Sequence, residues 1–364
     1  MKILFITDLY PIKEGEKQTP LTLHNFVFQW ISQGHEVDVI KPNFIFNSFL
    51  RKKPFYKAGF YNFQGVRVFN VNYFTPFLFD FTKKLPDSYD FGSYDLIIAH
   101  MPSGIIFANK LAEIFKKPLI CGVHVSDIEV LTKPIYGVYF RNQMKNAYKN
   151  AKKIACRSFV LQKKFCTLLP ELAEKTFVAA SGIELDAKMQ KGEEAKQKRN
   201  HSTIHVLTCA NLVKRKNIDK LILAVNDLLG FELTVIGDGV ELNKLKKINA
   251  TRVKFLGHLP HERVLEEMRN SDIFVLPSEN ETFGMVYLEA MASGCVTVCT
   301  KNDGIDGIIE DSKNGFLCEP TADAIKETLL KIKNHENIEE IIKNGFETLK
   351  NYTPDKCAEN YLKN

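Results

Sequence analysis

The sequence predicts an α/β protein built from two doubly wound domains, each with a parallel sheet lying between helices. Short continuous apolar runs alternate with longer amphipathic segments, and this alternation occurs twice along the 364 residues. A polar stretch, residues 188–202, separates the two series. Ligands of such sheets bind outside the carboxyl ends of the strands, so we expect the two domains to face each other across a cleft.

The first domain is expected in residues 1–187. Residues 2–6 form a continuous apolar strand, and residues 23–31 carry apolar side chains at helical spacing, in a helix that Gly34 ends. Apolar runs without polar alternation indicate strands that are buried on both faces, as in a parallel sheet. Further strands are predicted at 36–40, 66–71, 95–99, 119–122, 153–156 and 176–180.

The second domain is expected in residues 203–350, after the linker. It repeats the order of the first, with helices between buried strands. Its strands are predicted at 204–209, 232–236, 253–256, 273–277, 296–300 and 315–318. Its helices are predicted at about 217–229, 241–248, 261–270 and 284–293.

Composition excludes several classes of protein. No run of 18 uncharged apolar residues is present, so the sequence predicts no membrane-spanning helix. The first apolar run has four residues and is too short for a signal peptide. The eight cysteines include no Cys-x-x-Cys pair, which argues against a zinc site or a disulfide framework. We therefore expect a cytoplasmic protein, and we expect no bound metal.

Charge and aromatic residues are concentrated in the first half. Residues 1–190 hold 25 Lys and Arg against 16 Asp and Glu, and 14 of the 40 aromatic residues lie between Phe44 and Phe81. Two interpretations of segment 44–63 remain open. It forms either a contact with an anionic membrane surface, on the inner face of the cell membrane, or a pair of strands with an aromatic core face and a solvated basic loop. The basic residues of this segment are Arg51, Lys52, Lys53 and Lys57.

A second basic feature is the spacing of Arg141, Lys145 and Lys149, which puts three cations on one face of a helix. This face is either solvated or meets an anionic acceptor or a lipid headgroup. The sequence contains no pattern of a nucleic-acid-binding module, so we expect no nucleic-acid partner.

The most informative stretch is residues 277–294, where a strand ends at Pro277 and a helix begins near Gly284. The first backbone N–H groups of a helix have no partner within it, so the amides of residues 283–286 form a candidate anion site for a phosphate. Glu281 precedes this helix start and Glu289 follows it. Two carboxylates beside an anion site suit the binding of hydroxyl groups.

This stretch resembles the signature of retaining glycosyltransferases of the GT-B fold, family 4, also called glycosyltransferase group 1. That signature reads P-S-x-x-E-x-F-G-x-x-x-x-E-A-M-A-x-G, and residues 277–294 match it at all ten fixed positions. Segments 34–37, 235–239, 255–258 and 314–317 resemble further landmarks of the family. The resemblance implies two Rossmann-like domains, the first binding the acceptor and the second the donor. It also implies that a last helix, in residues 351–364, packs back on the first domain.

The resemblance implies a role for each matched residue. Glu281 would hold hydroxyls of the transferred sugar, Glu289 the ribose, and Lys216 the diphosphate as the glycosidic bond breaks. The donor would be a nucleotide diphosphate sugar, with no cofactor and no metal. The other residues expected around the donor are Phe283, Gly284, Met285, Val286, Arg215, Asn211, Gly237, His258 and Gly15.

Two positions depart from the family pattern. The family commonly has Gly-Arg-Leu where this chain has Ala210-Asn211-Leu212, so one phosphate-binding arginine is missing, and Arg215 is the candidate substitute. The usual Gly-Gly pair after the first strand is absent, and Gly15 alone stands in that loop.

Three polar residues of the first domain follow predicted strands. His100 comes after strand 95–99, and His124 with Asp127 comes after strand 119–122, so all three are expected at carboxyl ends that face the cleft. The resemblance implies that a histidine here contacts the sugar or the reacting centre. We predict His100 as the catalytic one, with His124 and Asp127 binding substrate.

Taken together, the sequence predicts a retaining glycosyltransferase that moves a sugar to a hydroxyl of a glycan or lipid-linked acceptor. Cell-surface polysaccharide, lipopolysaccharide or glycoconjugate synthesis is the expected setting. Two alternatives remain open. One is a catalytically silent subunit that binds a nucleotide sugar, and the other is an epimerase or phosphorylase with the same fold.

Overall fold

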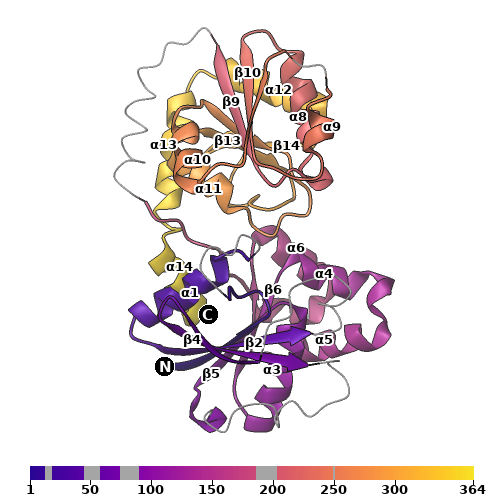
Figure 1. Ribbon diagram of the computed structural model, residues 1–364, viewed down its shortest axis with the longest axis vertical. Coiled ribbons are helices and arrows are strands. Elements are labelled where there is room, and N and C mark those ends of the chain that lie inside the picture. The colour runs from indigo at the N-terminus through magenta and orange to yellow at the C-terminus, as the bar shows by residue number, and fades with distance from the viewer. Residues whose placement is uncertain (13–18, 45–57, 74–89, 186–202, 249–250) are drawn as a thin grey trace. The chain divides into compact units, whose positions relative to one another are not determined.

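The computed structural model describes residues 1–12, 19–44, 58–73, 90–185, 203–248 and 251–364, and these form two compact units (Figure 1). Unit 1 comprises Met1–Arg157, Leu161–Ala180 and Pro354–Asn364. Unit 2 comprises Ser158–Val160 and Ser181–Thr353. The chain thus passes from unit 1 to unit 2 near residue 180 and returns to unit 1 at Pro354.

Unit 1 is built on an eight-stranded sheet of order β3-β4-β2-β1-β5-β6-β7-β8. All neighbouring strands are parallel except β3 and β4, which form an antiparallel pair at the edge. The strands are β1 Lys2–Thr7, β2 Glu36–Phe44, β3 Gly59–Phe63, β4 Val66–Tyr73, β5 Leu96–His100, β6 Leu119–Val123, β7 Lys153–Cys156 and β8 Thr176–Val178. Strands β5 and β6 are buried along their whole length, which agrees with their continuous apolar runs.

Helices cover both faces of this sheet (Figure 1). They are α1 Thr22–Ser32, α3 Pro102–Phe115, α4 Val125–Thr132, α5 Val138–Asn150, α6 Phe159–Leu168 and α14 Pro354–Lys363, with 3-10 turns η2 Phe91–Ser93, η3 Pro134–Tyr136 and η4 Pro170–Lys175. The carboxyl-terminal helix α14 packs on α1, where Trp30 Nε1 donates to the Ala358 carbonyl at 3.0 Å. The Tyr361 ring makes edge contacts with Phe26 and Trp30.

Unit 2 has a six-stranded parallel sheet of order β11-β10-β9-β12-β13-β14. In chain order this is 3-2-1-4-5-6, the doubly wound arrangement of dinucleotide-binding folds, whose order reverses between β9 and β12. The strands are β9 Ile204–Cys209, β10 Phe231–Ile236, β11 Val253–Gly257, β12 Ile273–Leu276, β13 Val296–Thr300 and β14 Phe316–Cys318.

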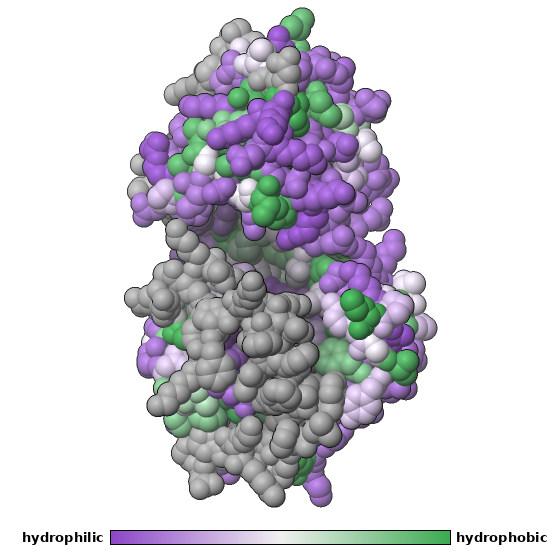
Figure 2. Space-filling view, turned by 45° about the vertical axis from the view of Figure 1, so that its right-hand side comes forward, coloured by the Kyte–Doolittle hydropathy of each residue, from purple (hydrophilic) through white to green (hydrophobic). Residues whose placement is uncertain are grey.

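The helices of unit 2 lie in two layers, with α10, α11 and α13 on one side of the sheet and α8, α9 and α12 on the other (Figure 1). They are α8 Ile218–Asn226, α9 Leu242–Leu245, α10 His261–Arg269, α11 Met285–Ala292, α12 Ala322–Lys333 and α13 Ile338–Leu349, and the 3-10 turn η5 spans Lys214–Lys216. Hydrophilic side chains cover most of the face of this unit seen in Figure 2. The apolar stripes of its helices therefore face the sheet.

The predicted α/β class, the parallel sheets and the doubly wound order are confirmed. Strand β3 is half-buried with an alternating pattern, as an edge strand is, and only the interpretation of segment 44–63 as a pair of strands allows for it. The helix predicted at 241–248 is shorter, because after α9 the chain continues in turns, with the Lys247 and Ile248 amides bonded three residues back. The cleft expected between the domains stays a prediction.

Several predictions fall outside the described residues. These are Gly15, the linker 188–202 and the basic loop with Arg51, Lys52, Lys53 and Lys57. The described part of segment 44–63 contains the strand β3, where the Phe60 ring packs at a tilt against Phe69 and the Arg67 guanidinium lies over the face of Phe60. Among the described helices, none is both long and apolar enough to cross a membrane.

Candidate functional site

The predicted donor residues of unit 2 gather at the carboxyl ends of β9 and β12, where the strand order reverses. Strand β9 leads into the η5 turn that carries Lys216, and β12 leads into the loop that carries Glu281. These strands are parallel neighbours, so both loops leave the same edge of the sheet. Residues 65 positions apart in the sequence therefore meet in one site.

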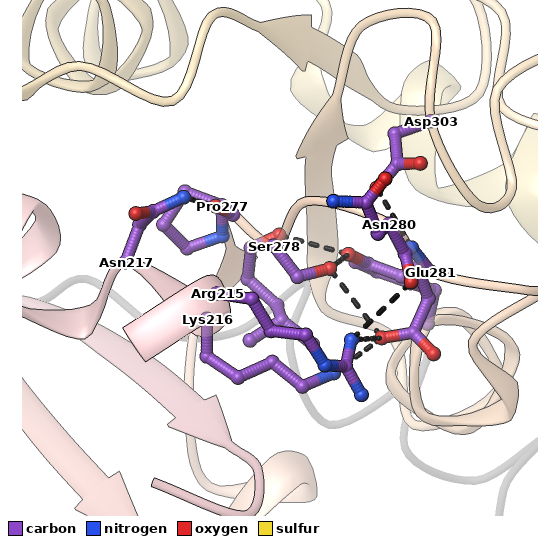
Figure 3. Close-up of polar contacts among 10 residues, drawn as sticks. Arg215, Lys216, Asn217, Pro277, Ser278, Asn280, Glu281 and Asp303 are labelled. Carbon is purple, nitrogen blue, oxygen red and sulfur yellow. Dashed lines mark hydrogen bonds and ion pairs between the residues drawn. The ribbon is translucent and has the colours of Figure 1, made fainter. Parts of the chain in front are cut away.

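An ion pair between Lys216 Nζ and Glu281 Oε2 forms the centre of the site (Figure 3). Both side chains are largely buried, with 9% of Lys216 and 17% of Glu281 exposed. Arg215 Nη1 lies 3.5 Å from the same carboxylate oxygen and is more exposed. Two cations thus share one carboxylate, and two further carboxylates lie close by, Glu279 on the same loop and Asp303 on the turn after β13.

The two loops are also fastened through their backbones. The Glu279 amide donates to the Arg215 carbonyl at 2.8 Å. Asn217 has a left-handed backbone, with a φ of 51°, and its Nδ2 donates to the Pro277 carbonyl at 3.0 Å and to Glu279 Oε2 at 2.8 Å. These bonds hold Lys216 against the 277–281 loop whether or not the ion pair is formed.

Glu281 is also positioned from the other side. Its amide donates to Asp303 Oδ2 at 3.0 Å, and the Ser278 hydroxyl lies 3.5 Å from its Oε2 (Figure 3). A Cβ added at Gly304 would lie 3.1 Å from the Glu281 Cβ, so the 303–304 turn packs directly on this residue. The Glu281 side chain is therefore held by three separate segments of unit 2.

Helix α11 begins at the predicted place. Gly284 is its N-cap, with a φ of 91°, and a Cβ there would lie 2.5 Å from the Tyr287 ring. That ring is fixed by the Tyr287 hydroxyl, which donates to the Leu276 carbonyl at 2.8 Å. Within the described part of the chain, the amides of residues 283–286 donate no hydrogen bond. They are the free donors that an anion site requires.

Glu289 lies on the first turns of α11 and meets a residue that sequence reasoning missed. His261 Nε2 is 3.1 Å from Glu289 Oε1, and this hydrogen bond raises the pKa of His261 above its usual value. Burial, with a contribution from the Glu289 charge, raises the pKa of the Cys209 thiol to about 12, while Lys216 opposes that rise. The charges of Glu289 and Lys216 thus both influence the pKa of Cys209, the last residue of β9.

Asn211 and Gly237 lie on two loops that pack together beside β9. A Cβ at Gly237 would lie 1.8 Å from the Ala210 carbonyl oxygen, so only glycine fits there. The Leu212 amide donates to the Asp238 carbonyl at 2.8 Å, and the Gly237 amide to the Gly257 carbonyl at 2.7 Å. His258 follows Gly257 at the end of β11. The missing arginine position thus lies on a tightly packed turn of the same sheet edge.

The three predicted residues of unit 1 also come together, but in the interior. His100 Nδ1 is 2.9 Å from His124 Nε2, and the Tyr361 hydroxyl is 2.9 Å from His100 Nε2. The Asp127 carboxylate accepts from the His124 amide at 2.9 Å and from the Tyr148 hydroxyl at 3.1 Å. None of the three predicted residues is more than 8% exposed.

Burial keeps both imidazoles of this cluster neutral. It holds the pKa of His100 well below the usual value, helped by the nearby His124 and Arg157, and it lowers the pKa of His124 to about 3. Burial also raises the pKa of Asp127 to about 7, against the hydrogen bonds that the carboxylate accepts. Both ring nitrogens of His100 have protein partners, which favours a positioning role, and its predicted catalytic role stays a prediction.

No metal site is evident in the ranges that the structure describes, because no group of three or more His, Cys, Asp or Glu side chains could hold an ion there.

Comparisons with known proteins agree with this geometry. Residues 189–348 match the family model of glycosyl transferases group 1, and residues 21–187 match that of glycosyltransferase family 4. An uncharacterized glycosyltransferase of Methanocaldococcus jannaschii is 31% identical over 275 residues, which cover 72% of this chain and 73% of that protein. A probable sucrose-phosphate synthase of Thermosipho melanesiensis is 28% identical over 213 residues, 54% of this chain and 49% of that protein.

Solved structures show the same fold. HepE of Anabaena in complex with UDP is similar with a TM-score of 0.72 at 19% identity, covering 100% of this chain and 99% of that one. Sucrose-phosphate synthase of Thermosynechococcus elongatus has a TM-score of 0.72 at 16% identity, with 100% and 97% covered. With both halves of the chain matched to family models, this protein belongs to the group 1 glycosyltransferases of the GT-B fold and is a transferase enzyme.

Proposed function

We propose that the site on unit 2 binds a nucleotide diphosphate sugar and that the protein transfers its sugar, with retention, to a hydroxyl of a glycan or lipid-linked acceptor. The observation that carries this proposal is that Lys216 and Arg215 pair with Glu281 directly before the free amides of residues 283–286. Cations and free N–H groups suit a diphosphate, and a carboxylate suits sugar hydroxyls. HepE of Anabaena has been solved in complex with UDP and with UDP-glucose, which supports this donor class.

Each residue then has a role in the transfer. The amides of residues 283–286 and the Arg215 guanidinium bind the diphosphate, Glu281 binds the transferred sugar, and Glu289 binds the ribose. The Lys216 ammonium has three N–H donors, so it can keep Glu281 and still bind a phosphate oxygen. Negative charge grows on the departing diphosphate as the bond to the sugar breaks, and a fixed cation stabilises that charge most in the transition state.

Retention follows when attack and departure take place on one face of the sugar. The bond from the anomeric carbon to the phosphate oxygen breaks, the bond to the acceptor oxygen forms, and the departing phosphate oxygen takes the acceptor proton. No side-chain nucleophile is needed on this route. In this proposal unit 1 binds the acceptor, with His124 and Asp127 shaping its site and His100 positioning His124.

The names of several relatives support the setting. One is a lipopolysaccharide core biosynthesis glycosyltransferase of Rhizobium meliloti, and another an amylovoran biosynthesis glycosyltransferase of Erwinia amylovora. We therefore propose a role in polysaccharide, lipopolysaccharide or glycoconjugate synthesis. The eight cysteines are all free thiols, which supports the proposed cytoplasmic, reducing compartment.

The test is a screen of uridine, guanosine and adenosine diphosphate sugars with candidate acceptors, measuring release of the nucleoside diphosphate. We expect release with one donor class and loss of release in Glu281→Gln. NMR of the product should show the same anomeric configuration as in the donor. Release that is unchanged in Glu281→Gln would remove this residue from the site.

Asn211 is the observation that favours a second candidate, a silent subunit that binds a nucleotide sugar. It stands where the family has a phosphate-binding arginine, on the turn packed against Gly239. Binding of a nucleotide sugar by calorimetry without turnover on any acceptor would support that candidate. Asn211→Arg should then strengthen donor binding, whereas an enzyme whose Arg215 already binds the diphosphate should gain little.

A further inference from the structure

The turn η3 and the start of α5 expose large apolar side chains. Ile135 is 87% exposed, Val138 69% and Tyr139 55%, and all three lie within five residues on the surface of unit 1. Single exposed apolar residues are ordinary, but a group of three within five residues marks a contact surface. Figure 2 brings forward the side of unit 1 that carries α4 and α5, where hydrophobic side chains stand out among hydrophilic ones.

The η3 turn is anchored to the hydrophobic core of unit 1. Tyr136 and Phe140 are partly buried against the hydrophobic core of unit 1, while the residues between and beside them point outward. The Gly137 amide donates to the Pro134 carbonyl at 2.9 Å, and Arg141 Nη2 donates to the Lys133 carbonyl at 3.2 Å. The apolar side chains are therefore presented by an anchored turn.

The charged residues of η3, α5 and the stretches of chain directly before and after them are all basic. Residues 133–153 contain six Lys and Arg and no Asp or Glu. Lys133 is paired with Glu129, but Lys145 and Lys149 lie one turn apart on α5, and Lys175 Nζ donates to the Lys149 and Ala151 carbonyls at its carboxyl end. On the neighbouring helices, Glu129 of α4 pairs with Lys133, and Glu113 of α3 accepts from Asn150.

We propose that this surface, made of η3 and α5, docks on an anionic lipid bilayer. Ile135 and Val138 enter the boundary between headgroups and acyl chains, Tyr139 lies at headgroup depth, and the cations of α5 contact lipid phosphates. A soluble polyanion would use the cations but gain nothing from the exposed aliphatic side chains. An apolar protein partner would use the exposed aliphatic side chains but gain nothing from the cations of α5.

The first test is co-sedimentation of the full chain with vesicles of phosphatidylcholine alone or with 30% phosphatidylglycerol, roughly the anionic content at which surface cations attract strongly. We expect binding to the anionic vesicles only. Ile135→Ser with Val138→Ser should weaken it at least tenfold at any salt concentration. Lys145→Ser with Lys149→Ser should weaken it at low salt and matter less at high salt.

Matched controls come from unit 2, where Leu229 is 77% exposed and Lys247 and Lys343 are exposed. Leu229→Ser, and Lys247→Ser with Lys343→Ser, should leave vesicle binding unchanged. Equal loss in the controls, or full binding in both test variants, would overturn the proposal. So would binding to a soluble polyanionic polysaccharide that the lysine variant loses while vesicle binding is kept.

The second test reports insertion itself. The chain has one tryptophan, Trp30, which is fully buried in unit 1, so Tyr139→Trp adds one exposed reporter to a constant background. We expect a blue shift with anionic vesicles and quenching by lipids brominated near the headgroup. Vesicle binding without any quenching would show that another part of the chain makes the contact. Because neither test uses a nucleotide, their failure would leave the proposed function untouched.

Discussion

Both units have polar residues at the carboxyl ends of their strands, but these residues are charged and partly exposed in unit 2 and neutral and buried in unit 1. In unit 2, the loops that follow β9 and β12 carry a charged cluster of Lys216, Glu281 and Arg215, and Arg215 is its exposed member. In unit 1, His100 ends β5 and His124 follows the neighbouring strand β6, but both side chains are buried and neutral. A strand end therefore predicts where a polar residue lies, and the segment packed above it decides whether a ligand can reach it.

The largest expected effect concerns the charged cluster. Lys216→Ala should lower turnover by about 100 to 1,000-fold, because a lost electrostatic contact to the leaving group costs about 2.7–4 kcal/mol. Steady-state kinetics with the donor found in the screen would measure it. Lys214→Ala, an exposed cation on the same 3-10 turn, is the control and should stay near wild type. Similar losses in both variants would indicate a general effect of charge.

The next effect concerns the sealed cluster. Tyr361→Phe removes the hydroxyl that lies 2.9 Å from His100 Nε2, leaving a buried ring nitrogen without its partner. The free energy of unfolding should fall by about 1–3 kcal/mol, as urea denaturation would measure. Tyr139→Phe, at an exposed tyrosine, should change it little. An unchanged stability in Tyr361→Phe would mean that the cluster is not closed by α14.

The third effect is a pH dependence that only the sealed cluster should show. The pKa of Asp127 is raised to about 7, so the folded chain binds this proton more tightly than the unfolded chain does. The stability it contributes is complete below pH 4 and is lost as the pH rises to about 7, with a slope of at most about 1.4 kcal/mol per pH unit. Asp127→Asn should remove this slope in urea denaturation across that range. A variant that keeps the slope would contradict the assignment.

The smallest expected effect is a pH dependence of donor binding at the site on unit 2. His261 is exposed and paired with Glu289, and its pKa is raised, so the pair is lost as the pH rises through that pKa. Ribose hydroxyls compete with His261 for Glu289, so the donor KM should fall with rising pH, by up to about fivefold as expected for an exposed pair. His261→Asn should flatten that profile. A profile that stays unchanged in the variant would separate His261 from the donor site.

The sequence predicted the framework well because each buried strand carries its own signal. The runs at 153–156, 204–209 and 296–300 became strands with those bounds, and the signature stretch became a loop and the start of α11. The partners of the site were harder to foresee. Asn217 reaches the 277–279 loop only through a left-handed backbone, and Asp303 contacts the Glu281 amide from a separate turn.

The burial of His100 could not be predicted for a similar reason. Its strand end suggests an exposed residue, but Tyr361 approaches it from 261 positions along the chain, on a helix that folds back on unit 1. His261 gave no signal either, because it begins an ordinary amphipathic helix and meets Glu289 only once α10 and α11 pack side by side. Contacts between distant segments decide accessibility, and local pattern does not record them.

Hydrogen–deuterium exchange tests most directly whether the start of α11 binds the diphosphate of the donor. With a saturating nucleoside diphosphate, peptides covering residues 277–288 should become strongly protected, while peptides covering 134–141 should exchange as before. Tight nucleotide binding without slower exchange at residues 283–286 would contradict the account.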